Sequence, residues 1–173
     1  MADRDALLAE LDAERTAFAD LLETVDAELA TAPGVVDDWS VRDLVVHLAF
    51  WCEHATEAIA LAVAGRGAEF AYASGDTDRM NADLITKSRR TSPGAAVDRE
   101  ARAYEAFSRA LASLDPALLG LRLGNGDTVE EVIRYDGPEH YREHTEHLRA
   151  WFGEDGAEEE HDAGTSSHAE RAN

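Results

Sequence analysis

Three histidines have the spacing needed to bind one metal ion. His140 and His144 lie four residues apart in a charged stretch, and His47 lies in an apolar stretch much earlier in the chain. Residues i and i+4 of a helix share a face, with Cβ atoms about 6 Å apart, so both imidazoles could reach one ion. His147 follows His144 by three residues, so the pair could instead be His144 and His147. The remaining histidine would then lie beside the site.

The surroundings of these histidines are apolar or aromatic. On a helical wheel, His47 falls within the inward stripe of its predicted helix, together with Leu44 and Trp51. The histidines of the later stretch lie within about 60° of Trp151 on the same wheel. Buried imidazoles need hydrogen-bond partners or a metal. We therefore expect the two helices to meet at a metal site.

Three more side chains could contribute to such a site. Asp43 lies one turn before His47 and could accept a hydrogen bond from its ring, although its spacing also fits a helix capping box. His54 shares the inward face but lies about 10.5 Å beyond His47 by helical rise, too far for the same ion. Glu143 completes a His-x-x-Glu-His string in which some zinc peptidases use the glutamate as a general base. That short string is weak evidence in an acid-rich helix.

Composition excludes several classes of partner and site. The 36 acidic and 16 basic residues give a formal net charge of −20, and Lys87 is the only lysine, so we expect no binding to nucleic acid or to anionic membranes. Cys52 is the only cysteine, which excludes an intrachain disulfide and any cysteine-rich zinc site. Its direction on the helical wheel predicts a packing role. With no signal-peptide pattern and no run of about 20 apolar residues, we expect a soluble, cytoplasmic protein.

The pattern of apolar residues predicts an all-α fold. Apolar residues recur every three or four positions in four longer segments, at about 4–29, 41–63, 95–114 and 138–152, and in shorter segments at 80–87 and 128–133. The sum is a four-helix bundle with an irregular crossover, 115–136, between the third and fourth long helices. We expect one domain, 1–153, followed by an acidic disordered tail, 154–173, in which His161 and His168 have no chemical role.

Three segments together resemble one known family. Trp39–Trp51 is similar to the second-helix motif of the DinB-like and mycothiol-dependent maleylpyruvate isomerase-like superfamily, which places a histidine some seven residues after a tryptophan and a small polar cap. Asp78–Ala82 is similar to its aspartate and asparagine element, and Glu139–His144 to its closing H-x-x-x-H element. The order and spacing of the segments match as well, between about Leu7 and Trp151.

The resemblance implies a ligand set and an activity. In this family one histidine of the second helix and two of the last hold a divalent ion, which here implies His47, His140 and His144 with zinc, nickel or iron. Members are four-helix bundles, often homodimers. The implied activity is transfer of a low-molecular-weight thiol, such as mycothiol or bacillithiol, to an electrophile in detoxification or stress response. A metal-dependent hydrolase with Glu143 as base, or a non-enzymatic binding protein that the metal stabilises, are the alternatives.

Overall fold

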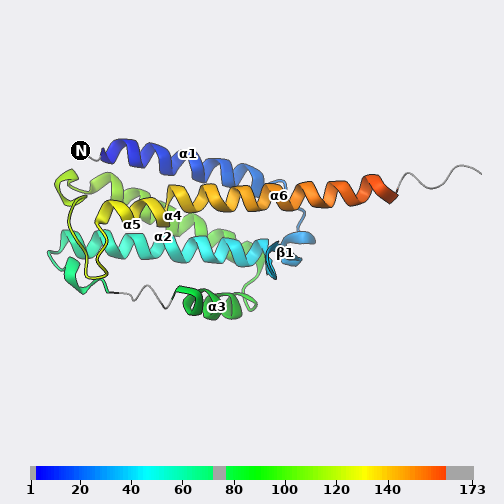
Figure 1. Cartoon of the computed structure of the whole chain (residues 1–173), viewed down its shortest axis with the longest axis horizontal. Helices are drawn as coiled ribbons and strands as arrows, with labels where there is room; N and C mark the ends of the chain where they lie inside the picture. Colours follow the sequence, from blue (N-terminus) through cyan, green and yellow to red (C-terminus); the bar gives the residue numbers. More distant parts are fainter. Residues whose placement is uncertain (1–2, 72–76, 163–173) are drawn as a thin grey trace, which may run out of the picture.

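The computed structural model describes residues 3–71 and 77–162, and the side chains up to Gly153. Helices dominate this part of the chain (Figure 1). The α-helices are α1 (Arg4–Leu22), α2 (Val41–Val63), α3 (Thr77–Ser88), α4 (Pro93–Ser113), α5 (Val129–Asp136) and α6 (Pro138–Asp162). Three short 3-10 turns, η1 (Leu29–Thr31), η2 (Gly67–Glu69) and η3 (Pro116–Leu118), and a hairpin of β1 (Pro33–Val36) and β2 (Trp39–Ser40) complete it.

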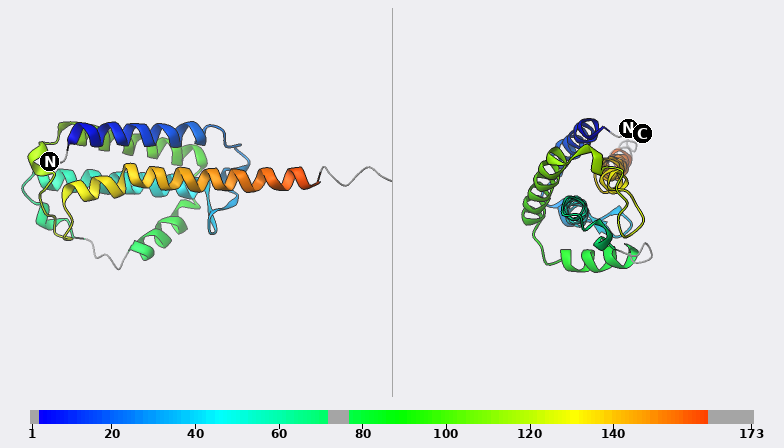
Figure 2. Two further views of the ribbon diagram at one scale, coloured as in Figure 1. Left: turned by 45° about the horizontal axis from the view of Figure 1, so that its top comes forward. Right: turned by 90° about the vertical axis from the view of Figure 1, so that its left-hand side faces the viewer.

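The long helices form the predicted bundle. α2 packs along α4, and α1 packs along α6, with α5 leading into α6 (Figure 1). The end-on view in Figure 2 places α3 outside these helices, beside α2. The all-α prediction is confirmed, and the crossover between α4 and α6 contains η3, a single β-bridge between Arg122 and Thr128, and α5.

α2 is the central helix, and its ends follow from local sequence. Ser40 and Asp43 form a reciprocal capping box at the start. At the other end, Gly65 adopts a φ of +69°, which stops the helix where an L-residue with a side chain would be strained. With a mean hydropathy of 1.2 over its best 18 residues, α2 is long and apolar enough to span a membrane, contrary to our expectation. However, 67% of that window is buried inside the bundle, as expected of a core helix.

Other element boundaries differ from the predictions. α1 ends at Leu22 rather than near Leu29. Leu29 follows a turn and is 38% exposed, so the helical spacing of the apolar residues between Leu22 and Leu29 does not correspond to a continuous helix. The hairpin was not predicted, because its strands are too short for a pattern of alternation. α6 continues to Asp162 instead of ending near Phe152, because glycine only weakens a helix. Residues 154–162 are therefore helical, and 163–173, with His168, lie outside the described residues.

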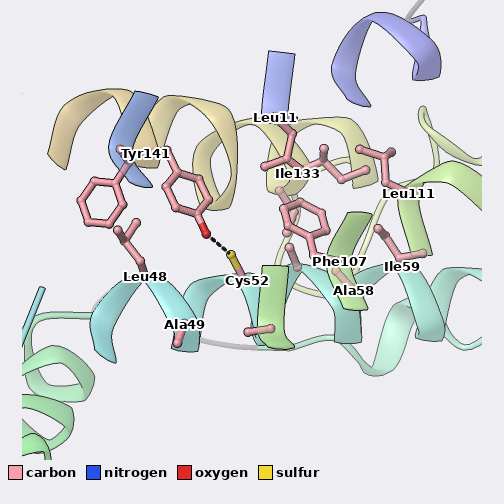
Figure 3. Close-up of a cluster of buried hydrophobic side chains, with 14 of the residues drawn as sticks. Leu11, Leu48, Ala49, Cys52, Ala58, Ile59, Phe107, Leu111, Ile133 and Tyr141 are labelled. Atoms are coloured by element: carbon pink, nitrogen blue, oxygen red, sulfur yellow. Dashed lines mark hydrogen bonds between the residues drawn. The ribbon is translucent and has the colours of Figure 1, made fainter. Parts of the chain in front are cut away.

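The core joins α2, α4 and α6 through a buried polar group as well as apolar packing. The Tyr141 hydroxyl donates a hydrogen bond of 2.6 Å to Glu100, and the Cys52 sulfur lies 3.3 Å from the same hydroxyl oxygen (Figure 3). Arg15 from α1 pairs with Glu100 at 3.0 Å. Burial raises the pKa of Cys52 to about 12, so it stays a thiol. Its predicted packing role agrees with this position, and Tyr141 fixes the rotation of α6 next to His140.

The junction between α5 and α6 depends on Gly137. A Cβ atom there would lie 2.6 Å from the Ile133 carbonyl oxygen and 2.8 Å from a ring carbon of Phe107. We therefore expect Gly137→Ala to lower the free energy of unfolding by about 3 kcal/mol, the scale of overpacking in a core. Urea denaturation measures this. Gly153→Ala, in open space on α6, is the control and should be neutral or slightly stabilising. Equal denaturation midpoints for the two variants would contradict the expectation.

Candidate metal centre

α2 and α6 bring the three candidate ligands together. His47 lies near the start of α2, on the face that packs into the core, and the capping box fixes where this helix begins. His140 and His144 occupy successive turns near the start of α6, and all three rings face one another. One ring nitrogen from each lies within 4.8 Å of the other two, an arrangement that could hold a metal ion.

The individual contacts show how closely the rings approach. The Nε2 atoms of His47 and His140 lie 2.8 Å apart, and the ring centroids of His140 and His144 lie 4.7 Å apart. Trp51, one turn after His47, donates its indole N–H to His47 Nδ1 at 3.3 Å. The ring of Trp39, from β2, lies edge-on 4.9 Å from His47. The unpredicted hairpin therefore forms one wall of the site.

Burial keeps these imidazoles neutral. Burial, and then the neighbouring His140, lower the pKa of His47 to about 3, and burial lowers the pKa of His140 to about 4. Burial, followed by the three surrounding histidines, moves the pKa of His144 far below its usual value. A metal ligand must be unprotonated, so these shifts suit coordination near neutral pH.

Unsatisfied polar atoms support the same interpretation. Within the described residues, three buried side-chain atoms have no hydrogen-bond partner: Asn81 Oδ1, His140 Nδ1 and His144 Nε2. All three residues line one cavity of about 350 Å³. A buried acceptor without a partner costs about 1–3 kcal/mol, so their convergence calls for a cation or a polar ligand. The residues therefore fit a divalent metal bound by three neutral imidazoles.

The other predicted residues take separate positions. Asp43 receives hydrogen bonds from Ser40 and Ser88 and pairs with Arg42 at 3.0 Å, so its carboxylate caps α2. These bonds match the capping alternative, and none of them reaches the ring of His47. Glu143 lines the cavity but is exposed.

His147 lies at the side of the histidine cluster. Its Nδ1 is 3.1 Å from Nδ1 of His144, and it lines the cavity without joining the group of three. A contact at Nδ1 leaves Nε2 of His144 to face the other two rings. His144 therefore remains in the group of three with His47 and His140, and His147 lies where it can orient His144.

His54 has a partner that sequence reasoning missed. Its Nδ1 lies 2.7 Å from Oδ2 of Asp136, and both side chains are buried. Asp136 ends α5 and lines the same cavity, one turn before His140. Asn81, on α3, was noted only for its resemblance to a motif, and no spacing within the sequence could have placed it over His47.

Comparisons with known proteins agree with this fold. Residues 11–150 match the family described as the mycothiol maleylpyruvate isomerase N-terminal domain. The chain belongs to this family. The match covers most of the bundle and includes all three candidate ligands, so the relationship inferred from three short motifs is confirmed. No curated protein matches the chain closely enough to count as a relative.

Solved structures show the same fold. An uncharacterised protein from Escherichia coli UTI89 superposes with a TM-score of 0.76 at 18% identity, covering 88% of this chain and 94% of that one. The colibactin self-resistance protein ClbS, solved in complex with a dsDNA, superposes with a TM-score of 0.72 at 16% identity, covering 85% and 93%. At these identities the likeness extends to the fold alone.

Proposed function

We propose that this protein holds one divalent metal on His47, His140 and His144 and uses it to transfer a low-molecular-weight thiol to an electrophile. The observation that carries the proposal is the convergence of three ring nitrogens in a cavity where two of these imidazoles retain an unpartnered buried nitrogen. Family membership supports a thiol-related role. Three protein ligands leave coordination positions open for a substrate.

The residues around the cluster have separable tasks in this proposal. When bound, the metal would lower the pKa of a thiol and so favour the nucleophilic thiolate. His147 orients the ring of His144 by a hydrogen bond at Nδ1, and the ring of Trp51 packs edge-on against the ring of His47. Trp39 and Val36, from the hairpin, cover the rings and limit the access of water.

The charge of the cavity favours an uncharged thiol. Its lining includes two carboxylates, Asp136 and Glu143, and among the described residues no lysine or arginine. Carboxylate-bearing thiols usually need a cation to bind against. A thiol whose remaining groups are hydroxyls and amides, such as mycothiol, fits this lining better than bacillithiol or another acidic thiol. Zinc, nickel and iron are all compatible with three imidazoles.

The other expectations about partners and location remain proposals. ClbS was solved with dsDNA, which concerns that protein; for this chain the net charge of −20 opposes binding to phosphate, and we still expect no nucleic-acid partner. A homodimer and a cytoplasmic location also remain predictions. Hydrolysis is the second candidate activity, because Glu143 lines the cavity and could serve as base to a water.

The test uses metal-loaded protein with a bimane electrophile and one thiol at a time. We expect the thiol conjugate to form faster than background with mycothiol, more slowly with bacillithiol, and at background rate with His144→Ala, as followed by mass spectrometry. A p-nitrophenyl ester, supplied without thiol, tests hydrolysis in parallel. Background rates with every thiol would contradict the transferase, and ester turnover that depends on Glu143 would favour the hydrolase.

A further inference from the structure

A buried titratable pair, His54 and Asp136, lies beside the cavity, and Asp136 is the member that lines it. His54 Nδ1 and Asp136 Oδ2 are 2.7 Å apart and link α2 to the last residue of α5. The exposed fractions of the two side chains are 8% and 2%. A buried imidazole–carboxylate pair is a poor source of stability compared with apolar residues of the same volume. The carboxylate of this pair lines the cavity of the three clustered histidines, so its position calls for a functional explanation.

The packing holds this pair in one place. The ring of His54 is enclosed by Phe50, Trp51 and Phe70, with centroids 6.4, 5.0 and 4.7 Å away. Gly137, next to Asp136, has no room for a side chain, so the end of α5 is fixed against the core. The carboxylate is thus positioned by its neighbours before any ligand binds, as an acid–base group must be.

We propose that Asp136, oriented by His54, is the base that accepts the proton of the thiol entering the cavity. This inference rests on the proposed function and adds a residue to it. The S–H bond breaks, its electron pair stays on sulfur, and a new O–H bond forms at the Asp136 carboxylate. His54 keeps its Nδ1 proton, and its Nδ1–H remains hydrogen-bonded to the carboxylate throughout the step. Asp136 then passes the proton to the leaving group of the electrophile or to water.

The alternatives in the cavity are less suited to this task. Glu143 is exposed, so its carboxylate is solvated and free to move. The three clustered imidazoles are occupied if they bind metal. Burial, opposed by the hydrogen bond from His54, raises the pKa of Asp136 to about 6, so the carboxylate is ionised at neutral pH and still basic enough to take a proton.

The experiment measures thiolate formation without turnover. Cobalt-loaded protein is mixed with 2-mercaptoethanol in a stopped-flow instrument, and the sulfur-to-cobalt absorption band reports the rate and the final amplitude. We expect Asp136→Asn to slow the band about 100-fold, the usual contribution of a general base, with cobalt content and final amplitude unchanged. Glu146→Gln, which removes an exposed carboxylate from α6, is the charge control and should match the wild type.

Each outcome separates the two proposals. A band in the wild type that forms equally fast in Asp136→Asn would overturn the role of Asp136 and leave the thiol function standing. No band in the wild type would overturn the thiol function itself, and this inference with it. If Asp136→Asn does not fold, His54→Gln keeps a donor to the carboxylate and should slow the band about tenfold; an unchanged rate would overturn the inference.

Discussion

Replacing His144 by alanine is expected to remove divalent metal from the protein. Wild-type protein incubated with zinc or nickel and then desalted should retain about one ion per chain, because three imidazoles from two helices converge within 4.8 Å. Loss of one of three ligands should leave well under a tenth of that amount. Elemental analysis measures the metal, and circular dichroism checks that the variant is folded.

Two further variants show whether metal binding depends on the positions of the histidines or only on their number. His147→Ala should keep the metal with affinity lowered about 10–100-fold, because His147 contacts His144 and does not join the group of three. His168→Ala removes a histidine outside the described residues and should behave as wild type. Equal metal content in His144→Ala and wild type would refute the ligand assignment.

We expect acid to destabilise the metal-free protein already at pH values well above those at which carboxylates usually titrate. The pKa values of His47 and His140 are lowered to about 3 and 4 in the folded state, and that of His144 is lowered further, from about 6.5 in the unfolded chain. Below pH 6.5 the unfolded chain therefore binds more protons than the folded one, and stability falls as the pH falls. Each imidazole contributes up to about 1.4 kcal/mol per pH unit.

Asp136 has the opposite effect on stability, over a narrower range of pH. Its pKa is raised to about 6, so between that pH and its unfolded value it takes up a proton more readily when folded. One group against three leaves a net loss, which we expect to be about 2–4 kcal/mol between pH 6 and 5. Urea denaturation of chelator-treated protein measures it. His144→Asn should reduce the pH dependence of the free energy of unfolding by the equivalent of about one proton. A free energy of unfolding that stays constant from pH 7 to 5 would show that the folded imidazoles protonate freely.

The sequence predicted the elements that have strong local signals. The capping box of Ser40 and Asp43, followed by an unbroken apolar stripe, predicted α2 and the inward direction of His47. The segment predicted to be helical at 128–133 likewise became α5, whose first turn Thr128 caps. The i, i+4 spacing of His140 and His144 indicated a shared face. These features depend on residues close together in the chain, which is why they could be predicted.

The remaining parts of the site depend on contacts between distant segments. Asp136 meets His54 across 82 residues, and Asn81 reaches the cavity from α3, which packs outside the bundle. The hairpin that brings Trp39 to His47 contains a turn in which Asp37 has a φ of +51°. Aspartate tolerates this conformation, but the presence of an aspartate does not by itself predict it. No periodicity in the sequence could have revealed these three features.

X-ray absorption at the edge of the bound metal tests the central claim most directly. Spectra of zinc- or nickel-loaded protein are compared before and after addition of mycothiol. We predict nitrogen or oxygen neighbours at about 2.0–2.1 Å with imidazole scattering from three rings, and one new sulfur neighbour at about 2.3 Å once the thiol is present. A spectrum with fewer imidazoles, or one in which no sulfur appears at saturating thiol, would contradict the account.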